Sequence, residues 1–232
     1  MSKNKSKTAN ETDQAQIAGA LTRAAARAQK RSTPSAATRQ QSAQQAARAA
    51  RRLSERAAAE SLTDISYAPL DSPFGPLLAA STSNGLVRLA FPEESTDAVL
   101  ERLAQRLSPR IVEASKPLEP VQRELEDYFS GRRRDFKLAL DWALIGPFAR
   151  KVLHRTAEIP FGGVLSYAEV AAEAGSPRGS RAAGNALGSN PIPIVIPCHR
   201  VLRSGGALGG YGGGLDRKRY LLELEGALQG DR

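Results

Sequence analysis

Cys198 is the only cysteine among 232 residues, and it is followed directly by His199, one of two histidines in the chain. A lone thiol forms no internal disulfide and cannot anchor a cysteine-rich metal site. As a thiolate, however, it is a strong nucleophile. The pair therefore indicates nucleophilic chemistry at Cys198. The alternative is an inert core cysteine, because apolar residues surround it and free cysteines are commonly buried.

The segments on either side of Cys198 must position it. The apolar run Ile192–Ile196 precedes it and predicts a buried strand. A glycine-rich segment, residues 204–214, follows and predicts a loop. A buried strand that ends in a reactive pair and a flexible loop is the arrangement expected of a prepared nucleophile.

Two short helices are predicted upstream. Residues 166–175 form a helix pattern with a capping box from Ser166 and Glu169 and a closing glycine. After a turn of Gly, Pro and Ser, Ser180 is expected to cap a second helix over residues 181–188. Two such helices suggest a helix-turn-helix unit, whose second helix enters a DNA groove, although an ordinary helical hairpin fits the pattern equally well.

Four ordered motifs carry a family resemblance. They are Pro160-Phe-Gly-Gly-Val-Leu-Ser-Tyr167, Arg181-Ala-Ala-Gly-Asn-Ala-Leu-Gly-Ser-Asn190, Pro197-Cys-His-Arg200 and residues 209–226. Across residues 146–227 they resemble the O6-alkylguanine-DNA alkyltransferases, also called methylated-DNA–protein-cysteine methyltransferases. The resemblance implies DNA repair in which the alkyl group of O6-alkylguanine, with O4-alkylthymine as a further candidate, moves irreversibly to Cys198 after base flipping. Each molecule would act once.

The resemblance also implies catalytic roles. His199 and Glu225 would form a Cys–water–His–Glu relay that deprotonates Cys198. Tyr167 would donate to the departing guanine, and Asn190 would fix the turn before the cysteine. From the residues alone, Glu225 lies near the end of a predicted helix and is more simply a solvated carboxylate.

DNA and substrate contacts are implied in the same way. Arg181 would be a finger that takes the place of the flipped base, since a planar guanidinium can stack there. Small side chains make the second helix slim enough for the minor groove. The implied DNA-binding residues are Ser180, Arg181, Ala182, Gly184 and Tyr211, and the implied substrate pocket consists of Pro193, Val201, Gly209, Tyr211 and Gly212. No metal and no cofactor are expected.

Two other functions compete with this interpretation. The first is a DNA-binding module without chemistry, either a helix-turn-helix regulator or an alkyltransferase-like lesion sensor. Sensors of that type lack the acceptor cysteine, which this chain has. The second is a cysteine hydrolase, which needs a histidine brought to the cysteine through space. His199 is adjacent in sequence and cannot readily take the thiol proton directly.

The chain before this region predicts a small α+β domain, residues 63–143, ahead of the alkyltransferase domain at residues 144–232. A hairpin is expected around residues 75–91, with strands also at 111–114 and 136–140. Helices are expected at residues 95–107 and 118–129. The domain resembles the family's ribonuclease-H-like N-terminal domain, and the second domain its helix-turn-helix, winged-helix-like one. The fold class is therefore α+β. Some relatives carry a structural zinc in the first domain. Residues 63–143 of this chain contain no cysteine or histidine that could bind one.

Residues 1–62 predict a disordered, basic tail. The first 60 residues hold 12 Lys and Arg against 4 Asp and Glu, with no aromatic residue. Such a segment buries too little apolar surface to offset chain entropy. Its Ala-rich pieces, Gln14–Gln29 and Ala36–Leu62, could form exposed helices. The charge suggests nonspecific phosphate binding along DNA, and a solubilising extension is the alternative.

Charge, hydropathy and cysteine content bound the surroundings of the protein. The formal net charge is +9 and no apolar run approaches the length of a membrane span. The resemblance implies double-stranded DNA that contains O6-alkylguanine as the partner, and we expect no membrane contact and a monomeric state. A cytoplasmic, nucleoid-associated location is expected, or a nuclear one in a eukaryote, because a reducing compartment suits a single working thiol.

Overall fold

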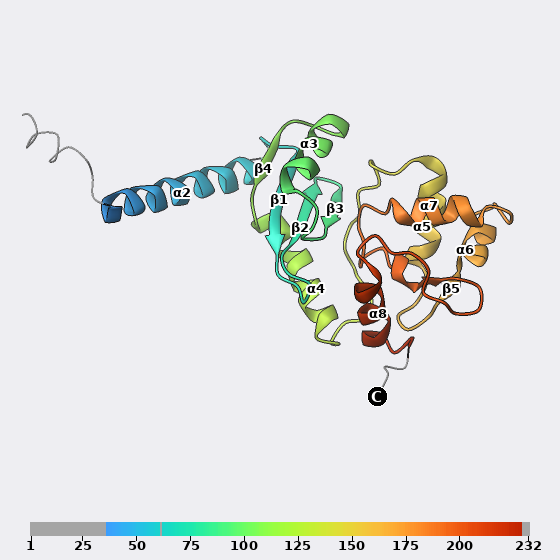
Figure 1. The fold of residues 1–232 in the computed structure, drawn as a ribbon. Helices are drawn as coiled ribbons and strands as arrows, with labels where there is room; N and C mark the ends of the chain where they lie inside the picture. Colours follow the sequence, from blue (N-terminus) through green and yellow to red (C-terminus); the bar gives the residue numbers. More distant parts are fainter. Residues whose placement is uncertain (1–35, 61, 229–232) are drawn as a thin grey trace, which may run out of the picture. The chain divides into compact units, whose positions relative to one another are not determined.

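The computed structural model describes residues 36–60 and 62–228 (Figure 1). One helix, α2 (Ala36–Ala59), occupies the described part of the predicted tail. Its Ala, Gln and Arg residues are strong helix formers, which accounts for a helix where disorder was the default expectation. Its side chains are mostly exposed. The predicted helix at Gln14–Gln29 and the rest of the predicted disorder lie outside the described residues.

A four-stranded sheet forms the core of the region before residue 143. Its strands are β1 (Ile65–Leu70), β2 (Leu77–Thr82), β3 (Gly85–Ala90) and β4 (Ile111–Glu113). The order is β3-β2-β1-β4, with the β1–β2 and β2–β3 pairs antiparallel and the β1–β4 pair parallel. The β2–β3 hairpin and β4 confirm the sequence prediction, whereas β1 was missed. Pro69 argues against a strand at β1, because proline lacks the backbone N–H that a ladder needs. On the side of β1 that faces β4, however, only residues 65–67 are paired, so the missing N–H of Pro69 interrupts no hydrogen bond there.

Helices α3 (Thr96–Arg106) and α4 (Glu119–Phe129) cover opposite faces of this sheet. Side chains alternate along a strand, so Leu78 of β2 packs with residues of α3 while its neighbour Leu77 packs with residues of α4. Both helices were predicted, and Ser95 is the N-cap of α3. The short 3₁₀ helix η1 (Lys116–Leu118) leads into α4.

The strand predicted at residues 136–140 is wrong. Only Leu140 makes a bridge, to Leu86 of β3, and the backbone N–H of Leu86 donates to the carbonyl oxygen of Ala139 at 2.9 Å. Farther along β3, the N–H of Leu89 instead donates to Pro191 at 2.8 Å. Two segments therefore share the edge of β3, and neither extends into a strand.

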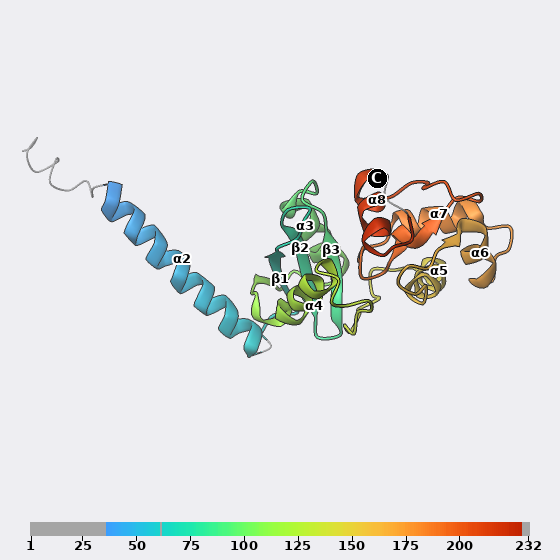
Figure 2. The ribbon, with the colours of Figure 1, turned by 90° about the horizontal axis from the view of Figure 1, so that it is seen from below.

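The second region is mainly helical. It contains α5 (Pro147–Ala157), α6 (Tyr167–Glu173), α7 (Ser180–Gly188) and α8 (Leu215–Leu224), with a 3₁₀ helix, η2 (Cys198–Arg200). Strands β5 (Leu165–Ser166) and β6 (Val201–Leu202) form a parallel pair. Figure 2 shows α5, α6 and α7 grouped together, and their buried residues belong to the same apolar cluster as α4. The sequence did not predict α5.

The predicted helix-turn-helix pair is present as α6 and α7. The capping box between Ser166 and Glu169 forms as expected. Ser180 is not the cap of α7, however, because Gly179 occupies that position and Ser180 is the first helical residue. A Cβ atom at position 179 would lie only 2.3 Å from Oγ of Ser176. This tight turn therefore accepts only glycine at the cap. None of the helices in the described ranges is long and apolar enough to span a membrane.

Candidate active site

The segment before Cys198 is a compact turn, and the predicted strand there is wrong. Prolines at 191, 193 and 197 remove backbone donors, so no ladder can run along this segment. Ile194 instead has a positive φ of 74°, and the N–H of Ile196 donates to Ile192 at 2.9 Å. The isoleucines are fully buried and anchor the turn in the core.

Asn190 holds this turn together, as its predicted role requires. Its Oδ1 accepts from the N–H of Ile192 at 3.0 Å, and its Nδ2 donates to the carbonyl oxygen of Ile196 at 2.9 Å. The same Nδ2 lies 3.2 Å from Sγ of Cys198. The side chain that closes the turn therefore also contacts the sulfur.

Cys198 is buried, with 7% of its surface exposed. Burial raises the pKa of its thiol, and the Asn190 hydrogen bond and the charge of Lys218 oppose that rise. The resting group is therefore a thiol at neutral pH. A nucleophilic reaction at this sulfur requires a base to remove its proton.

His199, the next residue, is the candidate for such a base. Its Nε2 lies 3.0 Å from Oε1 of Glu225, and both side chains are fully buried. Burial lowers the pKa of His199 while Glu225 opposes the change, so the imidazole is neutral at neutral pH. A carboxylate can only accept, so Nε2 carries the proton and Nδ1 is the basic nitrogen. Nδ1 has no hydrogen-bond partner among the described residues.

Glu225 is the C-cap of α8 and not the solvated carboxylate that the residues alone suggested. Arg200 donates to both of its oxygens, from Nε and Nη2, at 2.8 Å each. Tyr128 of α4 donates to Oε1 at 2.7 Å. Burial would raise the pKa of Glu225, but the hydrogen bonds from His199 and Arg200 overcome it and bring the pKa to about 2. The carboxylate is therefore charged at neutral pH.

Gly162 brings the segment after α5 against this carboxylate. Its N–H points to Oε2 of Glu225 at 3.5 Å, and its φ is +76°. A Cβ there would lie 2.9 Å from the backbone oxygen of Glu225. Only glycine allows the two backbones to approach so closely.

Tyr167, at the start of α6, lies half-buried beside the thiol. Its hydroxyl donates to the carbonyl oxygen of Gly210 at 3.2 Å. Burial and the neighbouring Cys198 raise the pKa of this phenol, so it stays protonated. Gly184 of α7 is close to the ring, since a Cβ there would lie 3.7 Å from it.

The remaining predicted DNA-binding residues lie on or near α7. Arg181 and Ala182 are exposed, and Ser180 and Gly184 are partly exposed. On the other side of the helix, Ala183, Ala186 and Leu187 are buried in the core. The small residues of α7 therefore serve both a close-packed inner face and a slim outer face.

Lys218 of α8 secures the glycine-rich loop. Its fully buried Nζ donates to the carbonyl oxygens of Val201 (2.6 Å), Leu208 and Gly210 (3.4 Å). Burial lowers the pKa of Lys218 to about 8, and the nearby Cys198 opposes that shift. An ammonium group bonded to three carbonyl groups holds the loop beside the sulfur.

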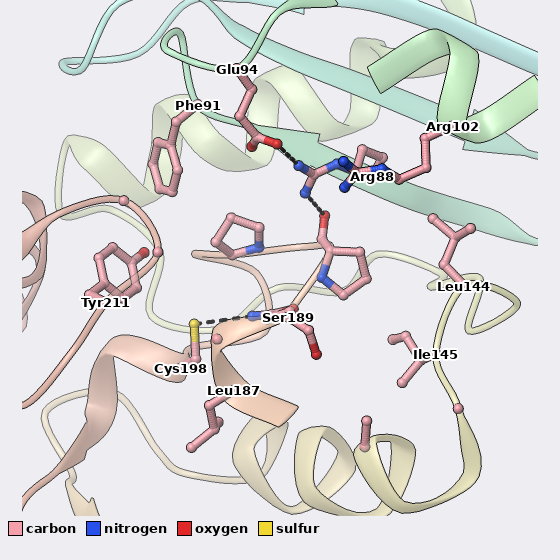
Figure 3. Close-up of a pocket in the computed structure, with 18 of the residues that line it drawn as sticks. Arg88, Phe91, Glu94, Arg102, Leu144, Ile145, Leu187, Ser189, Cys198 and Tyr211 are labelled. Carbon is pink, nitrogen blue, oxygen red and sulfur yellow. Dashed lines mark hydrogen bonds and ion pairs between the residues drawn. The ribbon is translucent and has the colours of Figure 1, made fainter. Parts of the chain in front are cut away.

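Two cavities meet at Cys198. One, of about 400 Å³, has Cys198 and Tyr211 on one side and Leu144 and Ile145 on the other, with Arg88 above them (Figure 3). A second, of about 520 Å³, is lined by residues of α6, α7 and the glycine-rich loop, among them Tyr167, Arg181, Arg203 and Gly210. Cys198, Tyr211 and Gly212 line both cavities. The sulfur is therefore reached from the side of α7 and from the side of β3.

The predicted substrate-pocket residues divide between these walls. Pro193 lines the first cavity, and Tyr211 and Gly212 line both. Val201 is buried in β6, and Gly209 packs on the Tyr167 ring, so neither lines these two cavities.

Sequence reasoning missed Arg200, Lys218 and Tyr128 as site residues. Each had a signal: Arg200 belongs to the Pro-Cys-His-Arg motif, and Lys218 shares the buried helical face of Leu221 and Leu222. Tyr128 follows Val121 and Leu125 on the buried face of α4. That spacing predicts a core residue, but it says nothing of the hydroxyl.

Comparisons with known proteins agree with this geometry. A family profile described as the DNA-binding domain of 6-O-methylguanine DNA methyltransferase matches residues 147–227, and one described as its ribonuclease-like domain matches residues 65–142. The methylated-DNA–protein-cysteine methyltransferase of Methanosarcina acetivorans is 37% identical over 163 residues, which are 69% of this chain and 98% of that protein. The chain belongs to the 6-O-methylguanine DNA methyltransferase family.

Relatives from mycobacteria point the same way. The methylated-DNA–protein-cysteine methyltransferase of Mycobacterium tuberculosis H37Rv is 40% identical over 162 residues, 69% of this chain and 92% of that protein. A crystal structure of the M. tuberculosis O6-methylguanine methyltransferase aligns with a TM-score of 0.59 at 34% identity, over 72% of this chain and 96% of that one. A crystal structure of M. tuberculosis OGT in complex with DNA aligns with a TM-score of 0.58 at 36% identity, over 69% of this chain and 92% of that one. Members of this family act in DNA repair by methyl transfer to a protein cysteine, and this chain is such a methyltransferase.

The pKa of Glu225 predicts an acid-sensitive contribution to stability. The folded pKa is about 2, below the ordinary value of 4.5. Ionised Glu225 therefore stabilises the fold above about pH 4.5, and that contribution, roughly 3 kcal/mol, is lost as the pH falls toward 2. Urea unfolding between pH 6 and pH 2.5 measures it. Glu225→Gln should be less stable at neutral pH and lose less stability on acidification. Glu223→Gln, at an exposed position two residues earlier, is the control and should follow the wild-type curve.

Proposed function

We propose that this protein repairs O6-alkylguanine in duplex DNA by moving the alkyl group to Sγ of Cys198 in a single turnover. The observation that carries the proposal is the buried His199–Glu225 pair directly after the sole thiol, with Nδ1 of His199 unpartnered among the described residues. A base held neutral and oriented by a charged carboxylate is what a buried thiol needs.

In the proposed reaction, a bridging water passes the thiol proton of Cys198 to Nδ1 of His199. The resulting thiolate attacks the alkyl carbon, a carbon–sulfur bond forms, and the carbon–oxygen bond to guanine breaks. The electron pair of that bond remains with the guanine, where the hydroxyl of Tyr167 offsets the developing charge. His199 stays positively charged against Glu225. The product is a thioether, so no step regenerates the thiol.

The two cavities support separate places for the base and the alkyl group. The cavity beside α7 contains Tyr167 and Arg181, which suit a flipped guanine and the space that it leaves in the duplex. In the cavity beside β3, Pro193, Phe91 and Ile145 offer apolar contacts for an alkyl group, and the charged side chains of Arg88, Glu94, Arg102 and Arg106 line the same cavity. O4-alkylthymine is a second candidate substrate. A monomeric state and a cytoplasmic, nucleoid-associated (or nuclear) location stay predictions.

Intact-protein mass spectrometry tests the proposed transfer. After incubation with a methylated oligonucleotide, the protein should gain one methyl group, on the Cys198 peptide, and never more than one. Cys198→Ala should gain none while it still binds DNA, because phosphate and groove contacts lie elsewhere. Repeated turnover, or a label on another residue, would contradict the mechanism. A cysteine hydrolase would release product without a stable adduct, and a lesion sensor would bind without transfer.

Arg181 should matter for flipping and not for the chemistry. It is exposed at the start of α7 and lines the same cavity as Tyr167. Arg181→Ala should slow repair of duplex DNA by an order of magnitude or more, since unstacking a base costs a few kcal/mol. Its rate with free O6-benzylguanine, which needs no flipping, should stay near wild type. Arg178→Ala, in the turn before α7, is the matched control. Equal losses on both substrates would refute the role of a finger.

The basic tail should add salt-sensitive DNA affinity. Residues 1–50 hold nine Lys and Arg against two Asp and Glu. Deletion should stop at residue 50, because Arg51 and Glu55 hydrogen-bond to Ser115. Each lost phosphate contact lowers the log–log salt slope of binding by about 0.9, so the slope should fall by a few units. A tail of equal length with Gln in place of Lys and Arg should match the deletion. If the salt slope of DNA binding does not change after the deletion, the tail does not bind phosphates and a solubilising role is the alternative.

A further inference from the structure

Tyr128 is the residue of the ribonuclease-like domain that reaches the carboxylate of Glu225. It lies on α4, is fully buried, and donates from its hydroxyl to Oε1 at 2.7 Å. Among the described residues, the other hydrogen-bond donors to Glu225 are His199, Arg200 and Gly162, all from the DNA-binding domain. A domain without the reactive thiol therefore contributes directly to the group that orients the base.

Packing alone does not require this hydroxyl. The ring of Tyr128 lies among Phe129, Phe136 and Phe161, with centroids 5.3, 5.1 and 6.2 Å away. A phenylalanine would fill the same space without a polar atom. A buried hydroxyl is costly unless it has a partner, and the partner here is the carboxylate. The hydroxyl therefore acts through Glu225.

The hydroxyl and the imidazole bind the same oxygen. Oε1 of Glu225 accepts from Tyr128 and lies 3.0 Å from Nε2 of His199. A donor on a carboxylate oxygen withdraws charge from it, so less remains to stabilise a proton on the imidazole. We propose that Tyr128 is a positioning residue for alkyl transfer, whose hydroxyl fixes Oε1 of Glu225 and limits how strongly that carboxylate favours the protonated form of His199.

Glu225 and Lys218, which both act on His199, keep their charges over the acid limb of the pH profile, because their pKa values are about 2 and about 8. Arg200 of η2 and Lys218 of α8 both oppose its protonation, and the ring of Tyr211 lies 6.4 Å from the imidazole. Tyr128 itself stays protonated, because burial and then the charge of Glu225 raise its pKa well above the usual range. Its hydroxyl therefore donates to Oε1 of Glu225 throughout the pH range, and its removal changes that one hydrogen bond.

The sign of the effect follows from the reaction. Transfer needs neutral His199, so activity falls on the acid side as the pH drops through the pKa of His199. Loss of the Tyr128 hydroxyl leaves more charge on Oε1 and raises that pKa. The acid limb of Tyr128→Phe should therefore move to higher pH, by roughly half a unit. A stronger donor at the same place should move it to lower pH.

The experiment measures single-turnover transfer from free O6-benzylguanine to the full-length protein between pH 5 and pH 9. It compares wild type with Tyr128→Phe and with 3-fluorotyrosine incorporated at position 128, whose phenol is more acidic. Tyr220→Phe is the matched control. Tyr220 lies on α8, 5.1 Å from the ring of Phe74, and its hydroxyl makes no hydrogen bond among the described residues. Its pH profile should equal that of the wild type.

Opposite shifts for Tyr128→Phe and fluorotyrosine support the inference. A wild-type profile in folded Tyr128→Phe, or a shift in the same direction for both variants, overturns it. If Tyr128→Phe does not fold, the fluorotyrosine protein decides alone, since it keeps the ring and the hydroxyl. The inference rests on the transfer to Cys198 proposed above. Failure of the wild type to acquire a methyl group from the methylated oligonucleotide would refute that function, whereas normal transfer with unmoved profiles would refute only the role of Tyr128.

Discussion

The carboxylate of Glu225 is the centre on which the reactive site depends. It is buried, yet it stays charged because the guanidinium of Arg200 binds both of its oxygens and His199 and Tyr128 bind Oε1. Charge-assisted, two-pronged hydrogen bonds are among the strongest that a protein forms. Removal of the carboxylate would leave Arg200, His199 and Tyr128 buried without this acceptor, which is costly. Four segments that are distant in sequence, α4, the Gly162 turn, η2 and the end of α8, are therefore held at one point.

Burial sets the reactivity of the thiol in two opposite ways. It raises the pKa of Cys198, so the resting sulfur is protonated and protected from adventitious oxidants, and it lowers the pKa of His199, so the imidazole is a free base. Lys218 adds a positive charge near the sulfur while it holds the glycine-rich loop in place. The same burial therefore keeps the acid and its base in complementary states.

The ribonuclease-like domain takes part in this arrangement through three contacts. The edge of β3 accepts the Asn190–Pro197 turn, with the N–H of Leu89 and the guanidinium of Arg88 both donating to Pro191. Phe91 packs edge-on against Tyr211, and Tyr128 reaches Glu225. These contacts touch the turn before the sulfur, the loop after it and the carboxylate behind it. The domain is thus part of the support of the site, and its edge strand is covered by the segment that carries the cysteine.

The sequence by itself determined the local features. The lone Cys198, the Ser166–Glu169 capping box, the β2–β3 hairpin and the extents of α3, α4 and α7 follow from residue type and short-range spacing, which act over a few residues. Only the tertiary structure decided that Glu225 is buried and charged, that Lys218 is enclosed by carbonyl groups, and that residues 136–140 form no strand. Burial, pKa and the competition of two segments for the edge of β3 depend on groups brought together from positions up to 103 residues apart. No local pattern encodes such contacts, because they exist only once the chain has folded.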